Sequence, residues 1–248
     1  MTKKRVSQQA TFFKKISQDY SDLNALNVPI MMRVKKIVDP YIKGNTLDIG
    51  NGGIISYDLK NVSKLLLADI VIDPLVNPKI LKAGKLQPLK KTKFKYKKMS
   101  VLDLGLPPNT FDTVVMFTVA HHLAEKNIKV SEQKVDLAFK QINRVLKKGG
   151  NLVIAECCPT VLYEIPQALF FSLAYKILIK FGKPLPYFLS KQKITDLLEN
   201  NKFKIVHKEL VPSGQAKVYL PVFSKLSPPG WMRDLVLSSW VFVAKKAD

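Results

Sequence analysis

Short apolar runs alternate with amphipathic helical segments through the middle of the chain. The clearest helical segment lies between residues 117 and 152, where the apolar positions from Val135 to Leu146 fall on one face of a helix. Ser131 is its predicted N-cap and Gly149 its predicted C′ residue. Strands alternating with helices predict an α/β fold with a mostly parallel sheet. Five runs bounded by Gly, Pro, Asn or Asp are predicted strands: Leu47–Ile49, Leu65–Ala68, Phe94–Met99, Val114–Phe117 and Leu152–Ala155.

The two ends of the chain have a different character from this central part. Residues 8–42 predict two helices, of which the second ends before Pro40. Residues 159–189 are rich in Phe, Leu, Ile and Tyr and are punctuated by prolines, as expected of helices that lie over a binding cleft. Two further strands are predicted at 203–210 and 239–244. We expect one domain over 1–248, divided into a helical segment (1–43), a core (44–158), a hydrophobic helical lid (159–200) and closing strands (201–248).

Composition excludes several classes of protein and leaves the charge to be explained. The 248 residues are 47% hydrophobic and contain only 11 Gly and 2 Cys, which excludes a disordered, collagen-like or disulfide-stapled chain. Lys and Arg number 40 against 19 Asp and Glu, giving a net charge of +21. Only Arg5, Arg33, Arg144 and Arg233 are arginine, although phosphate and base recognition favours the guanidinium group. The charge is therefore open to three interpretations: compositional bias, contact with an anionic membrane surface, or contact with RNA.

A basic run extends from Leu75 to Lys98, with nine lysines and no acid. At its end Phe94 and Tyr96 alternate with lysines, as in a strand with one apolar and one solvated face. The run predicts either an edge strand that lysine protects from aggregation or an electrostatic contact with anionic lipid or RNA.

Cellular location and metal content are predicted from three features: the length of the apolar stretches, the N-terminal segment, and the number and spacing of cysteine and histidine. The longest apolar stretch, 165–181, contains two lysines and is shorter than the ~20 residues that cross a bilayer, and no signal peptide is recognised. The adjacent Cys157 and Cys158 form no Cys-x-x-Cys motif, and the chain has three histidines, so we expect no metal. We expect a cytoplasmic protein that can be peripheral at a membrane.

The first predicted strand leads into a glycine-rich turn that suits a nucleoside ligand. Asp48 is followed by Gly50, Asn51 and Gly52, and glycines let the backbone approach a ligand closely. Asp69 ends the next strand nineteen residues after Gly50, close to the ~20-residue spacing at which a carboxylate meets ribose hydroxyls. The alternative is structural, with Asp48 as a turn cap and Asp69 as a solvated strand end.

Four motifs in this order resemble the class I S-adenosylmethionine-dependent methyltransferases, in particular the methyltransferase type 11 group. They are LDIGNGG at 47–53, LADI at 67–70, FDTVVMFTVAHHL at 111–123 and RVLKKGGNLVI at 144–154. The resemblance implies a Rossmann-like seven-stranded sheet with an antiparallel last strand, and S-adenosylmethionine as cofactor. The cofactor-binding residues that it implies are Asp48, Gly50, Asn51, Gly52, Asp69, Ile70, Val101, Leu102 and Thr118.

The sequence departs from the family pattern at two places. Ile54 stands where the last glycine of the first motif is usual, and little room remains for a helix before Lys64 begins the next strand. Ser100 stands where an acid usually lies near the adenine amino group, so adenine contact would rest on main-chain groups and on Val101 and Leu102.

Methyl transfer needs a base only when the acceptor must lose a proton. His121 and His122, just past the fourth strand, are the candidate catalytic residues because histidine titrates near neutrality. The alternative is that one histidine caps a helix and the other packs against the cofactor. Glu156 could orient an acceptor or be structural, and Tyr20 could close over the methionine end of the cofactor or belong to the core.

We therefore expect an enzyme that transfers a methyl group from S-adenosylmethionine to a small-molecule or lipid-like acceptor, bound by the aromatic segment 159–189. Its aromatic residues Phe170, Phe171, Tyr175, Phe181 and Tyr187 favour an apolar or aromatic acceptor. The alternatives are an RNA-directed methyltransferase and a non-catalytic binding protein that uses the lysine-rich surface.

Overall fold

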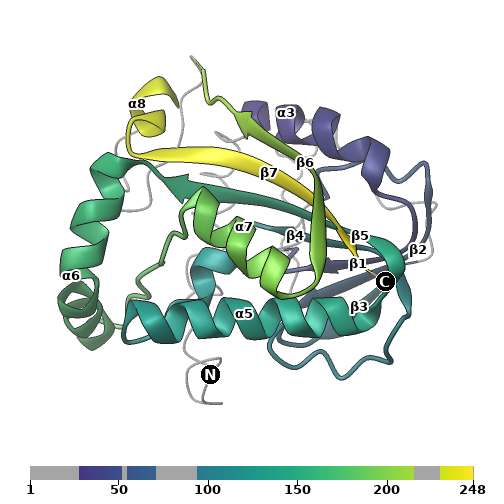
Figure 1. The fold of residues 1–248 in the computed structure, drawn as a ribbon, viewed down its shortest axis with the longest axis horizontal. Coiled ribbons are helices and arrows are strands. Elements are labelled where there is room, and N and C mark those ends of the chain that lie inside the picture. The colour runs from purple at the N-terminus through teal and green to yellow at the C-terminus, as the bar shows by residue number, and fades with distance from the viewer. Residues whose placement is uncertain (1–27, 52–54, 71–93, 215–229, 248) are drawn as a thin grey trace.

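The computed structural model describes residues 28–51, 55–70, 94–214 and 230–247 (Figure 1). The predicted first helix, Tyr20, Gly52 and most of the basic run lie outside the described residues.

A seven-stranded sheet forms the centre of the molecule, in the order β3-β2-β1-β4-β5-β7-β6 (Figure 1). Strands β1 to β5 pair in parallel, and β7 runs antiparallel to both of its neighbours, β5 and β6. The predicted Rossmann-like α/β sheet with an antiparallel last strand is confirmed. The strands are β1 (Gly44–Ile49), β2 (Val62–Asp69), β3 (Phe94–Lys98), β4 (Phe111–Phe117), β5 (Leu146–Pro159), β6 (Phe203–Val211) and β7 (Leu237–Lys246).

Helices cover both faces of the sheet, and an apolar cluster lies under each layer. On one face α3 packs over a cluster that includes Val34, Leu67 and Val241, and on the other α5 and α7 enclose a cluster that includes Phe139 and Phe242 (Figure 1). The helices are α3 (Val28–Val38), α5 (Ile128–Val145), α6 (Val161–Lys180), α7 (Lys191–Asn200) and α8 (Gly230–Asp234), with 3-10 turns η2 (Asp39–Tyr41) and η3 (Ala120–Leu123).

Helix α5 begins and ends earlier than the sequence predicts. Its N-cap is Asn127, whose side chain accepts a hydrogen bond from the Val130 amide at 2.9 Å. Ser131 is buried inside the helix and its hydroxyl donates to the Asn127 carbonyl at 2.8 Å, because a mid-helix serine can bond back to the preceding turn. β5 follows Val145 directly, so Gly149 lies within the strand region and is not the C′ residue.

The edge position of β3 is confirmed. Lys95, Lys97 and Lys98 are exposed while Tyr96 is half-buried, which is the alternation that the sequence indicates for an edge strand with one solvated face. The short connection between β1 and β2 is also as expected, since residues 55–61 contain no helix.

The segment after β5 differs most from expectation. α6 is a single helix of 20 residues that continues through Pro166, so it is long and apolar enough to cross a membrane, and the prediction that this segment is too short is wrong. Only 6% of its apolar window is buried. Phe170 and Phe181 are 59% and 74% exposed, so they do not line an interior site, whereas Phe171, Tyr175 and Tyr187 are buried.

Candidate active site

The predicted site residues that the structure describes gather at one edge of the sheet. Asp48 and Gly50 lie at the end of β1, Asp69 is the last residue of β2, and Thr118 follows β4. β5 brings Glu156 to the same edge, because parallel strands end together. This is the edge at which open α/β sheets bind their ligands.

Gly50 allows the loop after β1 to lie against the loop after β4. Its φ is +68°, in the left-handed region, and a Cβ at this position would lie 2.3 Å from Val119 Cγ2. Its amide donates to the Ala68 carbonyl at 2.7 Å, which ties the turn to β2. Only glycine fits here without moving Val119, so the two loops pack directly on each other.

Asp48 is buried, with 3% of its surface exposed, and supports the glycine turn from inside. Its Oδ2 accepts hydrogen bonds from Asn51 Nδ2 at 2.6 Å and from the Tyr57 hydroxyl at 2.8 Å. Burial raises the pKa of the carboxyl to about 7, against the lowering effect of the bonds from Tyr57 and Asn51, and the nearby Asp69 adds to the rise. The hydrogen bond between Asp48 and Asn51 therefore fixes the glycine turn. Tyr57 also binds Asp48, and the sequence pattern did not reveal this contact.

Asp69 is placed differently from Asp48. It is half-buried at the end of β2, and the Met99 amide donates to its carbonyl at 2.9 Å, so the end of β3 is fixed beside it. After β3, the amide of Asp103 donates to the Ser100 carbonyl at 3.0 Å and closes a turn that buries Val101 and half-buries Leu102. Ile70 is also half-buried. Asp69 is thus a partly accessible carboxyl at the end of β2, and Val101 and Leu102 lie in the turn after the neighbouring strand β3.

Thr118 turns the chain from β4 into η3. It has a φ of +55°, which is uncommon outside glycine, and its amide donates to the Ala155 carbonyl at 2.7 Å. Its side chain is exposed and bonds to the Phe117 carbonyl. The turn points the next residues, which include the histidine pair, toward the end of β5.

His121 and Glu156 form a buried pair where η3 meets β5. Nδ1 of His121 lies 2.6 Å from Glu156 Oε1, and the imidazole is 8% exposed while the glutamate is 2% exposed. The amides of Ala120 and Cys157 also donate to the carboxylate, each at 2.9 Å. Because Glu156 holds Nδ1, Nε2 is the ring nitrogen that can accept a proton.

His122 has another environment from His121. Burial, together with the neighbouring His121, places the pKa of His122 well below its usual value, so His122 is neutral at physiological pH. The two ring centroids are 4.0 Å apart. His121, in contrast, is paired with the carboxylate of Glu156.

The chain after β5 returns to cover His121. Phe188 stacks on its ring at 5.0 Å between centroids, and Tyr163, in the first turn of α6, meets Phe188 edge-on at 5.9 Å. The Tyr187 amide donates to the His121 carbonyl at 2.9 Å. Gln167 anchors this return: its amide group donates to the Phe188 carbonyl and accepts from the Phe188 amide. Gln167 is a buried polar residue in a mainly apolar helix, and such a residue is a signal that could have pointed to this contact.

Cys157 lies against an arginine side chain. Arg233 Nη2 lies 2.8 Å from its sulfur, and burial raises the pKa of the thiol, against the lowering effect of the Arg233 charge. Among the residues that the structure describes, no group of three or more His, Cys, Asp or Glu could hold a metal ion.

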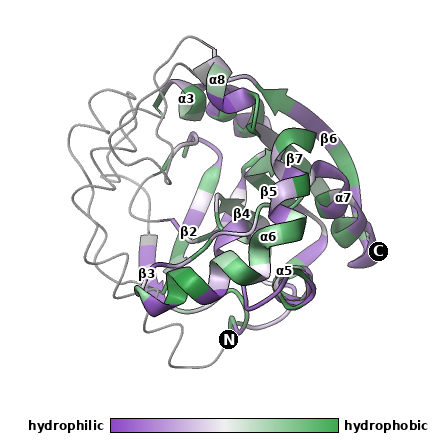
Figure 2. Ribbon diagram, turned by 90° about the vertical axis from the view of Figure 1, so that its left-hand side faces the viewer, coloured by the Kyte–Doolittle hydropathy of each residue, from purple (hydrophilic) through white to green (hydrophobic). Residues whose placement is uncertain are grey.

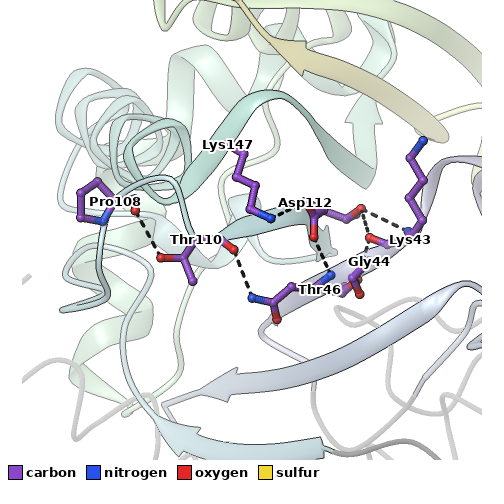
Figure 3. Close-up of polar contacts among 9 residues, drawn as sticks. Lys43, Gly44, Thr46, Pro108, Thr110, Asp112 and Lys147 are labelled. Atoms are coloured by element: carbon purple, nitrogen blue, oxygen red, sulfur yellow. Dashed lines mark hydrogen bonds and ion pairs between the residues drawn. The ribbon is translucent and has the colours of Figure 1, made fainter.

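The opposite edge of the sheet is closed by structural polar contacts (Figure 3). Asp112 accepts from the Asn45 amide at 2.8 Å and pairs with Lys147 at 2.7 Å. A Cβ on Gly44 would lie 2.6 Å from Asp112 Oδ2, so only glycine fits here without moving Asp112. The two edges are thus distinct, and the candidate site lies at the edge with Asp69 and His121.

The central part of the chain matches a known protein family. The family model described as "Methyltransferase domain" matches residues 47–154. No curated protein matches the chain.

Solved structures show the same fold at low sequence identity. A Burkholderia thailandensis 1,6-didemethyltoxoflavin-N1-methyltransferase has a TM-score of 0.61 at 14% identity, covering 100% of this chain and 91% of that one. A Methanosarcina mazei SAM-dependent methyltransferase has a TM-score of 0.52 at 16% identity, covering 85% and 97%. A Streptomyces coelicolor geranyl diphosphate C-methyltransferase has a TM-score of 0.56 at 11% identity, covering 87% and 77%.

The residues present fit S-adenosylmethionine. Gly50 gives a turn with a left-handed φ after β1, Asp69 supplies a half-buried carboxyl at the end of β2, and Val101 and Leu102 are apolar, which are the residue types expected around a nucleoside. Residues 47–154 therefore match a methyltransferase domain, and the chain has the fold of solved S-adenosylmethionine-dependent methyltransferases.

Proposed function

We propose that the enzyme methylates a small-molecule or lipid-like acceptor and that His121 receives the proton that the acceptor loses. The observation that carries this proposal is the buried His121–Glu156 pair at the cofactor edge of the sheet. A histidine oriented by a carboxylate is the usual arrangement of a general base.

The cofactor, when bound, supplies an activated methyl group, so the chain has to position the acceptor and exclude water. Asp69 would hold the ribose, the Gly50 turn would admit the rest of the nucleoside, and Val101 and Leu102 would contact adenine. Asp48 positions the turn through Asn51, and does so from a buried site.

His121 would accept the proton at Nε2 while Glu156 stabilises the resulting imidazolium through Nδ1. The carboxylate is suited to this because two backbone amides and the imidazole fix its orientation. In this role Glu156 is a positioning residue, since it acts through His121.

The acceptor side of the site favours an apolar or aromatic molecule. Phe188 stacks on His121 and Tyr163 contacts Phe188, so aromatic rings adjoin the proposed base. The printed names of two structural neighbours, a didemethyltoxoflavin methyltransferase and a geranyl diphosphate methyltransferase, denote small and prenyl acceptors. Among the described residues no comparable contact favours an RNA acceptor; the described lysines of the basic run lie on the edge strand β3.

The test is to incubate the protein with methyl-labelled S-adenosylmethionine and separated small-molecule, lipid and RNA fractions of cells, and to identify the labelled product. We expect label in the small-molecule or lipid fraction. His121→Gln should lower kcat by roughly 10²- to 10⁴-fold with cofactor affinity kept. Glu156→Gln should also lower kcat and should change its pH profile, which a merely structural role would not do. Label confined to RNA, or full turnover by His121→Gln, would overturn the proposal.

A further inference from the structure

Helix α6 carries an apolar stripe that the described part of the protein leaves uncovered (Figure 2). Six of the exposed apolar side chains, from Val161 to Phe181, recur every four residues; neighbours at this spacing lie next to each other, so they form a line that winds slowly along a helix roughly 30 Å long. Each side chain of the stripe has between 48% and 74% of its surface exposed. The stripe consists of Val161, Leu162, Ile165, Leu169, Phe170, Leu173, Ile177 and the C-cap Phe181.

The opposite side of α6 is fixed to the protein. Phe171 and Tyr175 are buried there, and Gln167 makes its two hydrogen bonds to the Phe188 backbone. These contacts set the rotation of the helix, so the stripe faces away from the domain. An apolar surface of this size is unusual on a soluble monomer and indicates a binding surface.

The short helix α8 extends the apolar surface at the beginning of α6. Trp231, Met232 and Leu235 are 50%, 46% and 53% exposed. Thr160, which precedes α6, binds the carbonyls of Leu235 and Val236, so the two elements are joined. A tryptophan at the border of an apolar surface is typical of membrane interfaces, where its ring has both apolar and polar neighbours.

Charge identifies the kind of partner. Three exposed lysines, Lys176, Lys180 and Lys183, lie at the C-terminal end of α6, where long side chains can reach lipid head groups. The whole chain carries +21, so an anionic surface attracts it, whereas a second copy would bring like charge against like charge.

Both ends of α6 are tied to the same domain, through Thr160 at its start and through the Tyr187 amide shortly after its end. The helix therefore lies along the domain and would enter a bilayer sideways rather than cross it. Interfacial helices of this kind bury their apolar side about 5–10 Å into the head-group boundary.

We propose that α6 and α8 form a surface that docks the enzyme on anionic lipid bilayers. The first turn of α6 contacts Phe188, which stacks on His121, so docking would place the acceptor side of the site next to the bilayer. That last consequence rests on the proposed function, whereas docking itself does not.

The test measures sedimentation of the full chain with vesicles of phosphatidylcholine alone or mixed with phosphatidylglycerol, at low and physiological salt. We expect binding to the anionic vesicles that weakens as salt rises. The double variant Leu169→Glu with Leu173→Glu should bind at least tenfold more weakly, and Lys176→Gln with Lys180→Gln should reduce the preference for anionic lipid.

Leu137→Glu is the matched control, because Leu137 is an exposed leucine, at 38%, on α5 and outside the stripe. It should bind vesicles as the unaltered chain does. Thermal unfolding checks that each variant folds, and titration with S-adenosylhomocysteine reports the cofactor site separately from docking.

Three results would overturn the proposal: no vesicle binding at low salt, equal loss in the Leu137→Glu control, or a dimer in solution that Leu169→Glu dissociates. The last would show that a second copy covers the stripe.

Discussion

Helices α5 and α6 precede and follow β5 in the chain, but the apolar side chains of α5 are buried whereas most of those of α6 are exposed. In α5 the apolar positions fall on one face, and Val135, Ala138, Phe139, Ile142 and Val145 are at most 1% exposed against the sheet. In α6 apolar residues occur on all sides, and most of the large ones are exposed. The hydrophobic content of a helix thus predicts that it packs against something. Only a one-sided apolar pattern indicates that it packs against its own domain.

Two acids show the converse arrangement. Asp48 and Glu156 are buried although carboxylates are usually exposed, and both lie at the cofactor edge of the sheet. Glu156 is held by backbone amides and His121, whereas Asp48 is held by neutral side chains and has a raised pKa. The exposed apolar side chains thus lie in the proposed docking surface on α6, and the two buried acids lie in the candidate active site.

The largest expected effect comes from truncating a buried apolar side chain of α5. Phe139→Ala removes a fully buried ring from the core and should lower the free energy of unfolding by about 3–5 kcal/mol. Leu173→Ala, in the exposed stripe of α6, should change it by no more than about 0.5 kcal/mol. Urea denaturation of both variants measures this. Comparable losses would show that α6 packs against the protein as α5 does.

A second prediction tests the buried acid Asp48. Its pKa in the folded state, about 7, lies above the unfolded value of about 3.8, so the native state binds more protons between these values. The stability of the unaltered chain relative to Asp48→Asn should therefore fall by roughly 1 kcal/mol per pH unit from pH 4 to 7 and stay level above. Urea unfolding at several pH values gives both curves, and parallel curves would contradict the assignment.

The smallest effect concerns how the two helices begin. Asn127 caps α5 with its side chain, whereas Thr160 makes no capping bond to α6 and binds the Leu235 carbonyl instead. Asn127→Ala should lower the free energy of unfolding by about 1 kcal/mol. Asn127→Asp keeps the acceptor and should preserve stability, as thermal unfolding can show. Equal losses in the two variants would mean that the acceptor oxygen of the cap is not what stabilises α5.

Residue patterns predicted the sheet well because its strands are short apolar runs separated by turn residues. The five parallel strands and the closing pair all form where expected. Local signals misplaced the ends of α5: Ser131 resembles an N-cap, but the helix begins one turn earlier, at a residue whose side chain reaches the free amides. Cap choice depends on where packing starts the helix, which periodicity alone does not fix.

The site was predictable where a motif fixes the backbone and less so where distant segments meet. Gly50 and Asp69 follow from the motif spacing, whereas Tyr57 and Phe188 reach the site through tertiary packing. The pairing of His121 with Glu156 joins residues 35 apart in the sequence, and no local pattern specifies it. The all-round apolar character of α6 likewise hid which side would face outward.

Binding of S-adenosylhomocysteine, measured by titration calorimetry on the unaltered chain and on Asp69→Ala, tests the central claim most directly. The account predicts saturable binding to the unaltered chain, with one site per chain, and at least tenfold weaker binding to Asp69→Ala, which loses the carboxyl proposed to hold the ribose. Absence of binding to the unaltered, folded chain would contradict it.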